Sequence, residues 1–351
     1  MRRPTIRNYV VCAAFCAALP GAWATTIPVT NTNDAGAGSL REAVALANAS
    51  DTITFDASTN GTPIVLGTGG ISIAVPLTVL GNGASNTVIS GGMLDRVFHI
   101  TNADGVELNG ITLTMGQAEH GGALLIAGSS VSLVDCMVTN SMAMINGGGI
   151  HATGGSLILM GTTVSGNLAS GAAASEGGGG IYNAMNTLMI DATSALTNNM
   201  ANGASGNGGG LFTASGMVQI TGATISGNAA NRAGGGIEVT VGDVTLMNVI
   251  LNDNDVAGEA GTPNPGNGGG LHATGASTIM ITGGTVNMNR AGREGGGLWN
   301  AAGSMTVDGV VVDGNVAHGP AAHDGGGGLF NNGGTLIVQN GTMITNNVAD
   351  G

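Results

Sequence analysis

The chain has 351 residues, of which 8 are basic and 21 acidic, and it contains no lysine, so its formal net charge is −13. Such a surface repels nucleic acids and anionic lipids, and we expect neither as a partner. Glycine supplies 66 residues, yet 42% of the chain is apolar and 8% is charged, which excludes the composition of a disordered polypeptide.

The N-terminal residues have the pattern of a secretory signal peptide. Met1-Arg2-Arg3 is basic, an apolar run extends from Tyr9 to Leu19, and Ala22-Trp23-Ala24 offers a small-x-small cleavage site. The apolar run is too short to span a bilayer. We therefore predict a signal peptide over residues 1–24 and an exported mature chain that begins near Thr25 and has no transmembrane segment.

The predicted mature chain has a single cysteine, Cys136, because Cys12 and Cys16 belong to the predicted signal peptide. One cysteine cannot form an intramolecular disulfide, although export would place the chain in an oxidising environment. We expect packing and hydrogen-bond ladders to stabilise the fold, and we expect a monomer.

Residues 39–48 have the pattern of a helix and follow a short strand predicted over Thr26 to Thr30. Ser39 and Glu42 form a capping box, in which each side chain satisfies a backbone amide at the start of the helix. The apolar residues on one face of this helix are Leu40, Ala43, Val44 and Ala47. We predict that the helix caps the end of the repeats described next.

A motif of a glycine run, an aliphatic residue and an asparagine 17 or 18 residues later repeats along the chain. The aliphatic residues are Ile150, Ile181, Leu211, Ile237, Leu271, Leu298 and Leu329. The asparagines are Asn167, Asn199, Asn228, Asn254, Asn289, Asn315 and Asn347. From each asparagine to the next aliphatic residue the distance varies from 9 to 17 residues. A constant spacing with variable segments at one place per repeat indicates a solenoid with loops at that place.

Each repeat contains three short runs with strand character. In the repeat that starts at Gly147 they are residues 149–152, 156–160 and 162–165. This pattern is typical of a right-handed parallel β-helix, in which each strand pairs with its equivalent one coil away. We therefore predict an all-β, right-handed parallel β-helix with three short strands per coil and a short N-terminal capping helix.

We divide the mature chain into an N-terminal cap with the first coils, residues 25–108, and β-helix repeats over residues 109–351. We expect the repeats to be truncated, because Gly351 comes directly after a complete asparagine motif. We interpret the asparagine column as structural, because a turn asparagine tolerates a left-handed conformation and can stack into a hydrogen-bonded ladder.

Two resemblances cover nearly the whole predicted mature chain. Ser39-Leu40-Arg41-Glu42-Ala43 resembles the hallmark of the CSLREA domain of exported bacterial β-helix proteins, with Gly38 in place of the usual cysteine. The glycine-run and asparagine motifs resemble the repeats of chlamydial polymorphic outer-membrane proteins, with an aliphatic residue in place of the phenylalanine. The resemblances imply a β-helix, a structural cap that includes Ser39, Arg41 and Glu42, and an exported life at the bacterial surface.

The residue after each aliphatic residue of the motif faces away from the core by strand alternation. This outward column reads His151, Tyr182, Phe212, Glu238, His272, Trp299 and Phe330. The side chains of the column either stabilise one another and are covered by the variable loops, or form an exposed aromatic stripe that binds a glycan or a protein. The candidate binding residues of such a stripe are His151, Tyr182, Phe212, His272, Trp299 and Phe330.

Catalytic residues are harder to find in this sequence. Pectate lyases and polygalacturonases use right-handed β-helices too, but fold alone does not carry function. Glycoside hydrolysis needs two facing carboxylates, and lyase chemistry needs a basic residue, but no single coil concentrates three acids with a histidine or an arginine. Arg290 and Arg293 lie in a loop beside Glu294, which suggests that they are solvated charges. His318 and His323 with Asp324 are weak evidence for a metal site. We assign no catalytic residue, no metal and no cofactor.

The sequence favours an exported surface or secreted interaction protein, adhesin-like, located outside the cell or at the outer membrane of a bacterium. Its expected partner is a host or bacterial surface glycan or protein. The alternative is a carbohydrate-active enzyme of the pectate-lyase-like type, either a polysaccharide lyase or a glycoside hydrolase. The absence of a concentrated set of acids makes the enzyme the second choice.

Overall fold

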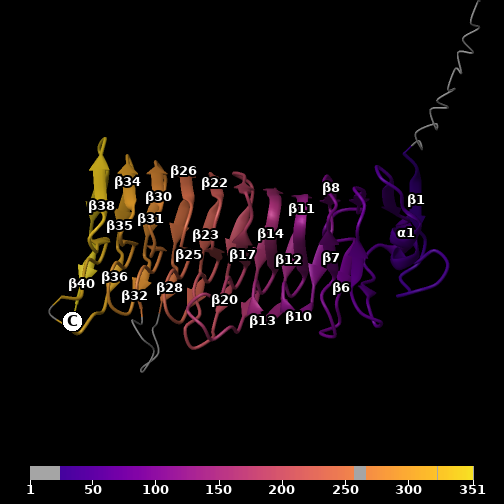
Figure 1. The fold of residues 1–351 in the computed structure, drawn as a ribbon, viewed down its shortest axis with the longest axis horizontal. Coiled ribbons are helices and arrows are strands. Elements are labelled where there is room, and N and C mark those ends of the chain that lie inside the picture. The colour runs from indigo at the N-terminus through magenta and orange to yellow at the C-terminus, as the bar shows by residue number, and fades with distance from the viewer. Residues whose placement is uncertain (1–23, 257–265, 322, 351) are drawn as a thin grey trace, which may run out of the picture.

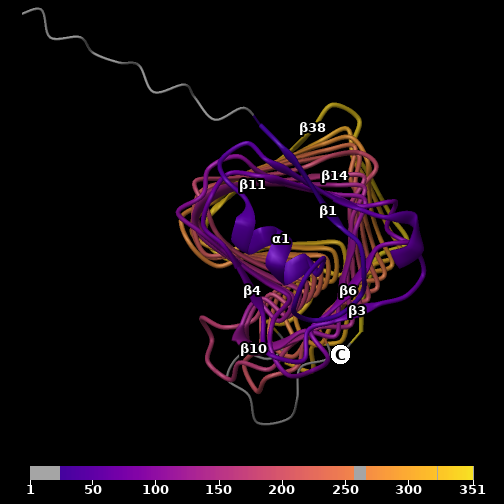
Figure 2. The same ribbon diagram turned by 90° about the vertical axis from the view of Figure 1, so that its right-hand side faces the viewer.

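The computed structural model describes residues 24–256, 266–321 and 323–350. The predicted signal peptide, except its last residue, lies outside them. Figure 1 shows one elongated solenoid whose coils follow one another from the N-terminal to the C-terminal end. Viewed along its axis in Figure 2, the coils superimpose and enclose a common interior. This architecture confirms the predicted parallel β-helix.

The largest sheet has 20 strands and contains the first half of every coil. Its strands are β1 (Thr26–Val29), β2 (Thr52–Phe55), β4 (Ile71–Ile73), β5 (Thr78–Leu80), β7 (Phe98–Thr101), β8 (Val106–Asn109), β11 (Leu124–Val134), β14 (Ile150–Met160), β17 (Ile181–Ala184), β18 (Thr187–Ile190), β21 (Leu211–Thr213), β22 (Met217–Thr221), β25 (Ile237–Val239), β26 (Asp243–Met247), β29 (Leu271–Ala273), β30 (Thr278–Thr282), β33 (Leu298–Asn300), β34 (Ser304–Asp308), β37 (Leu329–Asn331) and β38 (Thr335–Gln339).

Two smaller sheets complete each coil. The sheet of 11 strands contains β3 (Ile64–Val65), β6 (Val88–Ser90), β9 (Thr112–Thr114), β12 (Met137–Thr139), β15 (Thr163–Ser165), β19 (Ala195–Thr197), β23 (Thr224–Ser226), β27 (Ile250–Asn252), β31 (Thr285–Asn287), β35 (Val311–Asp313) and β39 (Met343–Thr345). The sheet of 9 strands contains β10 (Gln117–His120), β13 (Met142–Asn146), β16 (Leu168–Ala169), β20 (Met200–Ala201), β24 (Ala229–Ala230), β28 (Asp255–Val256), β32 (Arg290–Ala291), β36 (Val316–Ala317) and β40 (Val348–Ala349).

The strand count per coil differs in detail from the prediction. In β11 and β14 one strand of 11 residues covers the first two predicted runs, so these coils hold three strands. From β17 onward a turn divides this strand in two, and the coils hold four strands in three sheets. The short strand after the asparagine, such as β16, was not predicted, because two residues are too few to show an alternating pattern.

The aliphatic residues of the motif form an inward column, as predicted. Equivalent residues pair directly, for example Ile150 with Ile181 and Leu211 with Ile237. All but Leu329 are buried in one continuous core that also includes residues of the N-terminal coils and of α1 (Leu40–Leu46), and the partly buried Leu329 packs against this core. The same sheets cross position 108, so the predicted boundary there separates no independent cores.

Each glycine of the run is required for a different reason, as residues 208–210 show. Gly208 has φ +63°, a left-handed conformation that favours glycine. A Cβ on Gly209 would lie 2.4 Å from the carbonyl oxygen of Ala229, and a Cβ on Gly210 would lie 3.1 Å from Cγ of Asn228. The run therefore turns the chain, admits the neighbouring backbone and leaves room for the asparagine.

The seven asparagines form the predicted ladder, and six of them are buried inside the solenoid. The side-chain amide of Asn199 donates to Asn228 Oδ1 at 3.0 Å and to the Val164 carbonyl at 2.9 Å, and its backbone N–H donates to the same Oδ1 at 3.0 Å. The pattern repeats down to Asn347. Ser141 begins the series, because its backbone N–H donates to Asn167 Oδ1.

The left-handed conformation was expected at the ladder asparagines, but this expectation is wrong, because the conformation occurs one residue earlier. The positive φ belongs to the residue before each of them, such as Asn198 at +55° and Asp253 at +55°. The preceding residue therefore makes the turn, and the ladder asparagine keeps its side chain directed inward.

Replacement of one ladder asparagine should cost much more stability than replacement of a surface asparagine. In Asn228→Ala the amide and backbone N–H of Asn199 lose a buried acceptor and the Leu196 carbonyl loses its donor. At about 1–3 kcal/mol per unsatisfied buried group, we expect a loss of at least about 3 kcal/mol in chemical denaturation. Asn231→Ala, which removes an exposed bond to the Asn202 carbonyl and a partly buried bond to the Gly203 carbonyl, is the matched control and should cost less than about 1 kcal/mol. Equal effects of the two changes would contradict a structural ladder.

The predicted capping helix is confirmed as α1. Ser39 accepts a hydrogen bond from the Glu42 N–H at 3.2 Å, and the Glu42 carboxylate accepts from the Gly38 N–H at 2.6 Å. Arg41 pairs with Asp34 at 2.6 Å and donates to the backbone carbonyls of residues 69 and 70. Figure 2 shows α1 lying across the N-terminal end of the solenoid. The cap residues therefore have structural roles.

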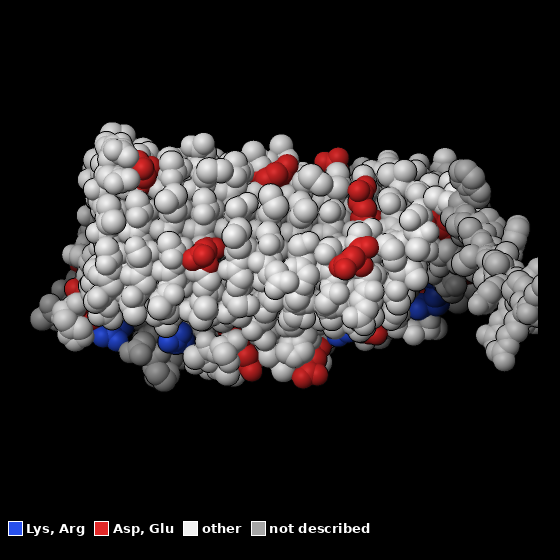
Figure 3. Space-filling view, turned by 45° about the horizontal axis from the view of Figure 1, so that its top comes forward, with Lys and Arg blue, Asp and Glu red and all other residues white. Residues whose placement is uncertain are grey.

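The surface of the solenoid carries little charge. Figure 3 shows one long face on which a few acidic side chains are scattered, with basic side chains along its lower edge. Within the described residues no helix is both long enough and apolar enough to cross a membrane.

Candidate functional site

The outward column forms two stacks of rings along the solenoid. His151 stacks on Tyr182 with ring centroids 4.8 Å apart, and Tyr182 stacks on Phe212 at 5.1 Å. Glu238 occupies the next position, after which His272 stacks on Trp299 at 4.1 Å. Trp299 lies 6.4 Å from Phe330, which completes the second stack. Register between coils therefore brings all the predicted binding residues into one row, interrupted by Glu238.

Of the two interpretations left open by the sequence, the exposed aromatic stripe does not hold for most of this row. Phe212 is 1% exposed, His272 3% and Trp299 6%, and Glu238 is buried as well. His151, Tyr182 and Phe330 are partly buried. The row faces away from the solenoid core, so something outside the core must cover it.

The segments between the asparagine and the glycine run provide this cover. Glu294, at the end of such a segment, accepts a hydrogen bond from the Trp299 indole N–H at 2.9 Å. His120, at the end of β10, lies 4.9 Å from the His151 ring. Figure 2 shows loops that protrude from the solenoid on the side of β10. The covered arrangement, one of the two interpretations left open by the sequence, is the one observed.

Glu238, the residue between the two stacks, is buried and forms a cluster with His272 and Thr274. Glu238 Oε2 lies 2.8 Å from His272 Nδ1, and both side chains are buried. Thr274 donates its hydroxyl to Glu238 Oε1 at 2.5 Å. Because the Glu238 carboxylate is the acceptor, Nδ1 of His272 carries the hydrogen of this bond. The other ring nitrogen, Nε2, takes no part in it. Nε2 has no hydrogen-bond partner among the described residues.

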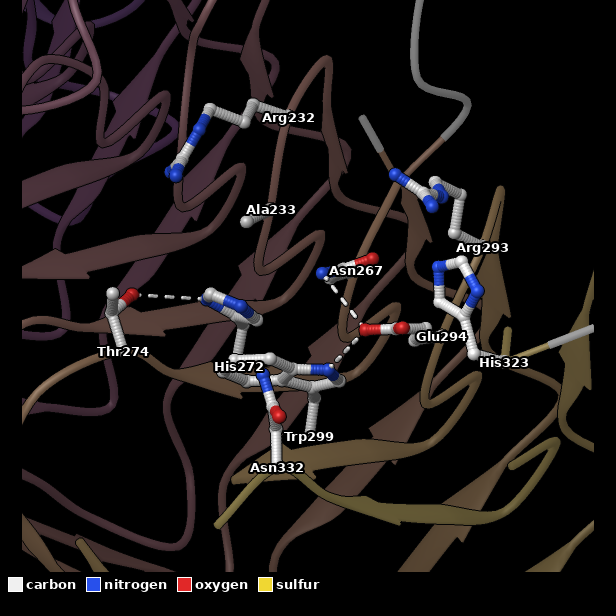
Figure 4. Close-up of a pocket in the computed structure, with 10 residues that line it drawn as sticks. All are labelled: Arg232, Ala233, Asn267, His272, Thr274, Arg293, Glu294, Trp299, His323 and Asn332. Atoms are coloured by element: carbon white, nitrogen blue, oxygen red, sulfur yellow. Dashed lines mark hydrogen bonds between the residues drawn. The ribbon is translucent and has the colours of Figure 1, made fainter. Parts of the chain in front are cut away.

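His272 and Thr274, but not Glu238, line a cavity of about 270 Å³ between the loops and the large sheet. The residues that line it are Arg232, Ala233, Asn267, His272, Thr274, Arg293, Glu294, Trp299, His323 and Asn332. Figure 4 shows Arg232 and Arg293 on the side opposite His272 and Trp299. Four successive coils contribute to the site, since the lining residues extend from position 232 to position 332.

The two arginines of the cavity differ in how strongly they are held. Arg293 makes a two-point contact with Asp324, at 2.9 Å and 3.4 Å, and the Asp324 side chain is fully buried. Burial raises the pKa of Asp324, but hydrogen bonds from Arg293 and the Ala321 backbone outweigh it and hold the pKa below its usual value. The expectation that Arg293 is a solvated charge is therefore wrong. Among the described residues Arg232 makes one hydrogen bond, from Nη1 to Asn207 Oδ1 at 3.0 Å.

The cavity also contains hydrogen-bond acceptors. Asn267 is 9% exposed, and its Oδ1 has no hydrogen-bond partner among the described residues. Its amide nitrogen lies 3.4 Å from Glu294 Oε2, the oxygen that binds the Trp299 indole. A ligand in this space would meet guanidinium donors on one side and amide and carboxylate acceptors on another.

Metal-binding geometry is absent from the described part of the chain, where no group of three or more histidine, cysteine or acidic side chains converges. His323 lies 3.6 Å from Asp324, but His318 contacts Asp350 and Arg290 instead. The three residues considered for a metal site are therefore not brought together.

Comparisons with protein-family models, with curated proteins and with solved structures find no match to this chain. The site must therefore be interpreted from its own geometry.

The sequence reasoning missed the Glu238–His272 pair because it searched for acids and bases within single coils. These residues are 34 positions apart but occupy paired positions of β25 and β29. In the outward column, Glu238 of one coil is followed by His272 of the next coil. This succession of an acid and a histidine was the sequence signal that could have revealed the pair. Thr274 and Asn267 could not be found in this way, because their roles depend on loop conformation.

His151 should make stability depend on pH. Burial, with the nearby charges of His120 and Arg96, lowers the pKa of His151 to about 4. An unfolded histidine has a pKa of about 6.5, so between these values the unfolded state binds more protons. Stability from this group is therefore complete above pH 6.5 and is lost as pH falls through 4.

We expect His151→Phe to remove this part of the acid-induced loss, up to about 3 kcal/mol, in denaturation curves at pH 7, 5.5 and 4. Tyr182→Phe, which changes the neighbouring ring of the stack and removes no imidazole, is the control and should keep the wild-type pH profile. A His151→Phe profile as steep as that of the wild type would show that another group causes the loss.

Proposed function

We propose that the protein is an exported interaction protein, adhesin-like, that binds a surface or matrix glycan at the cavity between its loops and its large sheet. Two features support this proposal: the signal-like residues 1–24, and a rigid solenoid that presents loops of variable length. The resemblances to CSLREA and polymorphic outer-membrane repeats point in the same direction. Binding residues are commonly located on loops held by a rigid scaffold.

The observation that carries the proposal is the concentration of rare side chains at this one cavity. The described residues contain five arginines, six histidines and one tryptophan, and the cavity takes two of the arginines, two of the histidines and the tryptophan. A few convergent polar groups around a concave site are typical of ligand binding. Trp299 has its two faces occupied by His272 and Phe330, so it supports the wall rather than stacking on a sugar.

A second candidate function is a carbohydrate-active enzyme, and the Glu238–His272 pair is the observation that favours it. A carboxylate that orients an imidazole is a common arrangement for a general base. The base candidate is His272 Nε2, at the wall of the cavity. Glu238 would act as a positioning residue. Among the described residues that line the cavity, Glu294 is the one acid, and its Oε2 already accepts from the Trp299 indole. Glycoside hydrolysis needs two facing carboxylates, so binding remains the better-supported function.

The proposal is tested with the purified protein and a panel of neutral and acidic polysaccharides, with and without calcium. We expect retention of at least one polysaccharide without new reducing ends and without absorbance from unsaturated uronates. Turnover would establish the enzyme instead, and it should then be lost in His272→Ala. If the panel is neither retained nor cleaved, glycan binding is excluded as the function.

The test needs a variant that keeps the fold and changes the cavity. Arg232→Gln alters a guanidinium at the cavity, whereas Arg290→Gln alters an arginine on β32 that does not line it. We expect retention to fall at least about tenfold in Arg232→Gln, because a charge-assisted hydrogen bond is lost, and to be unchanged in Arg290→Gln. Equal retention by the two variants would place binding elsewhere on the surface.

A further inference from the structure

The donors and acceptors of the cavity specify what its ligand must offer. Arg232 projects from the loop side, and it has no acidic partner among the described residues. Arg293 is neutralised by Asp324, so Arg232 is the cation that is open to a carboxylate. A planar guanidinium binds a carboxylate through two parallel hydrogen bonds.

The acceptors in the same space require hydrogen-bond donors from the ligand. Asn267 Oδ1 is a buried acceptor without a partner among the described residues, which costs free energy until a donor binds it. Glu294 uses Oε2 for the Trp299 indole and the Asn267 amide. Glu294 Oε1 has no hydrogen-bond donor among the described residues. This oxygen would accept a hydroxyl but repel a second anionic group. The ligand therefore combines one carboxylate with neutral hydroxyl groups.

The size of the cavity limits the ligand further. Its volume of about 270 Å³ is just below the 300–1,000 Å³ of most small-molecule sites, so it suits a single ring-sized group. Both faces of Trp299 are covered, and a sugar would therefore be held by its polar edge. A phosphate monoester fits poorly, because it carries about −1.5 to −2 charge and the charge beyond that of a carboxylate would face Glu294. A sulfate monoester has the same charge as a carboxylate but lacks the planar pair of oxygens that matches a guanidinium.

We infer that the cavity is a binding site for one uronate residue of an acidic glycan, with Arg232 bound to the carboxylate and Asn267 and Glu294 bound to ring hydroxyls. This inference rests on the proposed glycan-binding function and names the sugar class that the site selects. His272, held by Glu238, forms the floor and directs Nε2 toward a further hydroxyl. The residues come from adjacent coils, so the site depends on the register of the solenoid.

Trp299 supplies a direct readout of the site. The chain contains two tryptophans, and Trp23 lies in the predicted signal peptide, so the mature chain has Trp299 as its single tryptophan. In the chain with its signal peptide, Trp23→Phe gives the same result. The Trp299 indole donates to Glu294, and ligand contact with that carboxylate should change the indole fluorescence. The probes are the methyl glycosides of galacturonate and glucuronate, each compared with the neutral methyl galactoside or methyl glucoside.

We expect saturable fluorescence titration by at least one uronate glycoside, at least tenfold tighter than by its neutral counterpart. Arg232→Gln should remove this preference, and Asn267→Ala should weaken the binding of the uronate several-fold. Arg290→Gln should bind as the wild type does. Circular dichroism and thermal unfolding of each variant establish that the fold is kept, and the wild-type comparison of charged and neutral glycosides stands even if a variant does not fold.

Three results would overturn the inference: no titration by either uronate up to 10 mM, equal binding of uronate and neutral glycosides, or displacement of the uronate by an equal concentration of inorganic sulfate. If neutral polysaccharides are retained while uronates do not bind, the uronate site fails and glycan binding stands. If the uronate glycosides bind while no polysaccharide is retained, the site stands and the glycan-binding function fails.

Discussion

The structure depends on the in-register stacking of coils, and the buried asparagine ladder is the interaction that holds the register. An asparagine in the interior of a solenoid would cost free energy if its amide lacked partners. Here each amide is satisfied by the next coil and by a backbone carbonyl, for example Asn254 by Asn289 and Ile225. A shift of one residue would break these bonds and would move aliphatic side chains out of the core. The ladder therefore stabilises one alignment above all others.

In-register stacking also explains the candidate site. Equivalent positions of successive coils lie one above the other. Residues that recur once per repeat in the sequence therefore form a continuous row along the solenoid. The row that follows the glycine run contains rings in most coils and an acid at Glu238. The loops cover this row, and between β25 and β37 they leave the cavity. A site made from four coils needs no conserved motif within any one of them.

The repeat could be read from the sequence because its period is carried by residues with clear physical roles. The glycine run, the inward aliphatic residue and the ladder asparagine predicted the fold, and Ser39 and Glu42 predicted the cap. The direction of the outward column was predicted as well, but its exposure was not. Burial of Phe212 and Trp299 depends on loops in the segments between each ladder asparagine and the next aliphatic residue of the motif. The spacing from the asparagine to the aliphatic residue varies from 9 to 17 positions, and the loop conformations follow no period. The pairing of Glu238 with His272 could be recognised only by comparing equivalent positions of adjacent coils.

The ladder has a direction as well as a register. In every step the amide of one asparagine donates to the oxygen of the asparagine in the following coil, from Asn167 to Asn347. The side-chain dipoles are therefore parallel, and they add along the axis of the solenoid instead of cancelling. Aligned amides polarise one another, as the peptide groups of an α-helix do. The interior of this all-β protein thus contains a linear array of side chains with the electrostatic character of a helix.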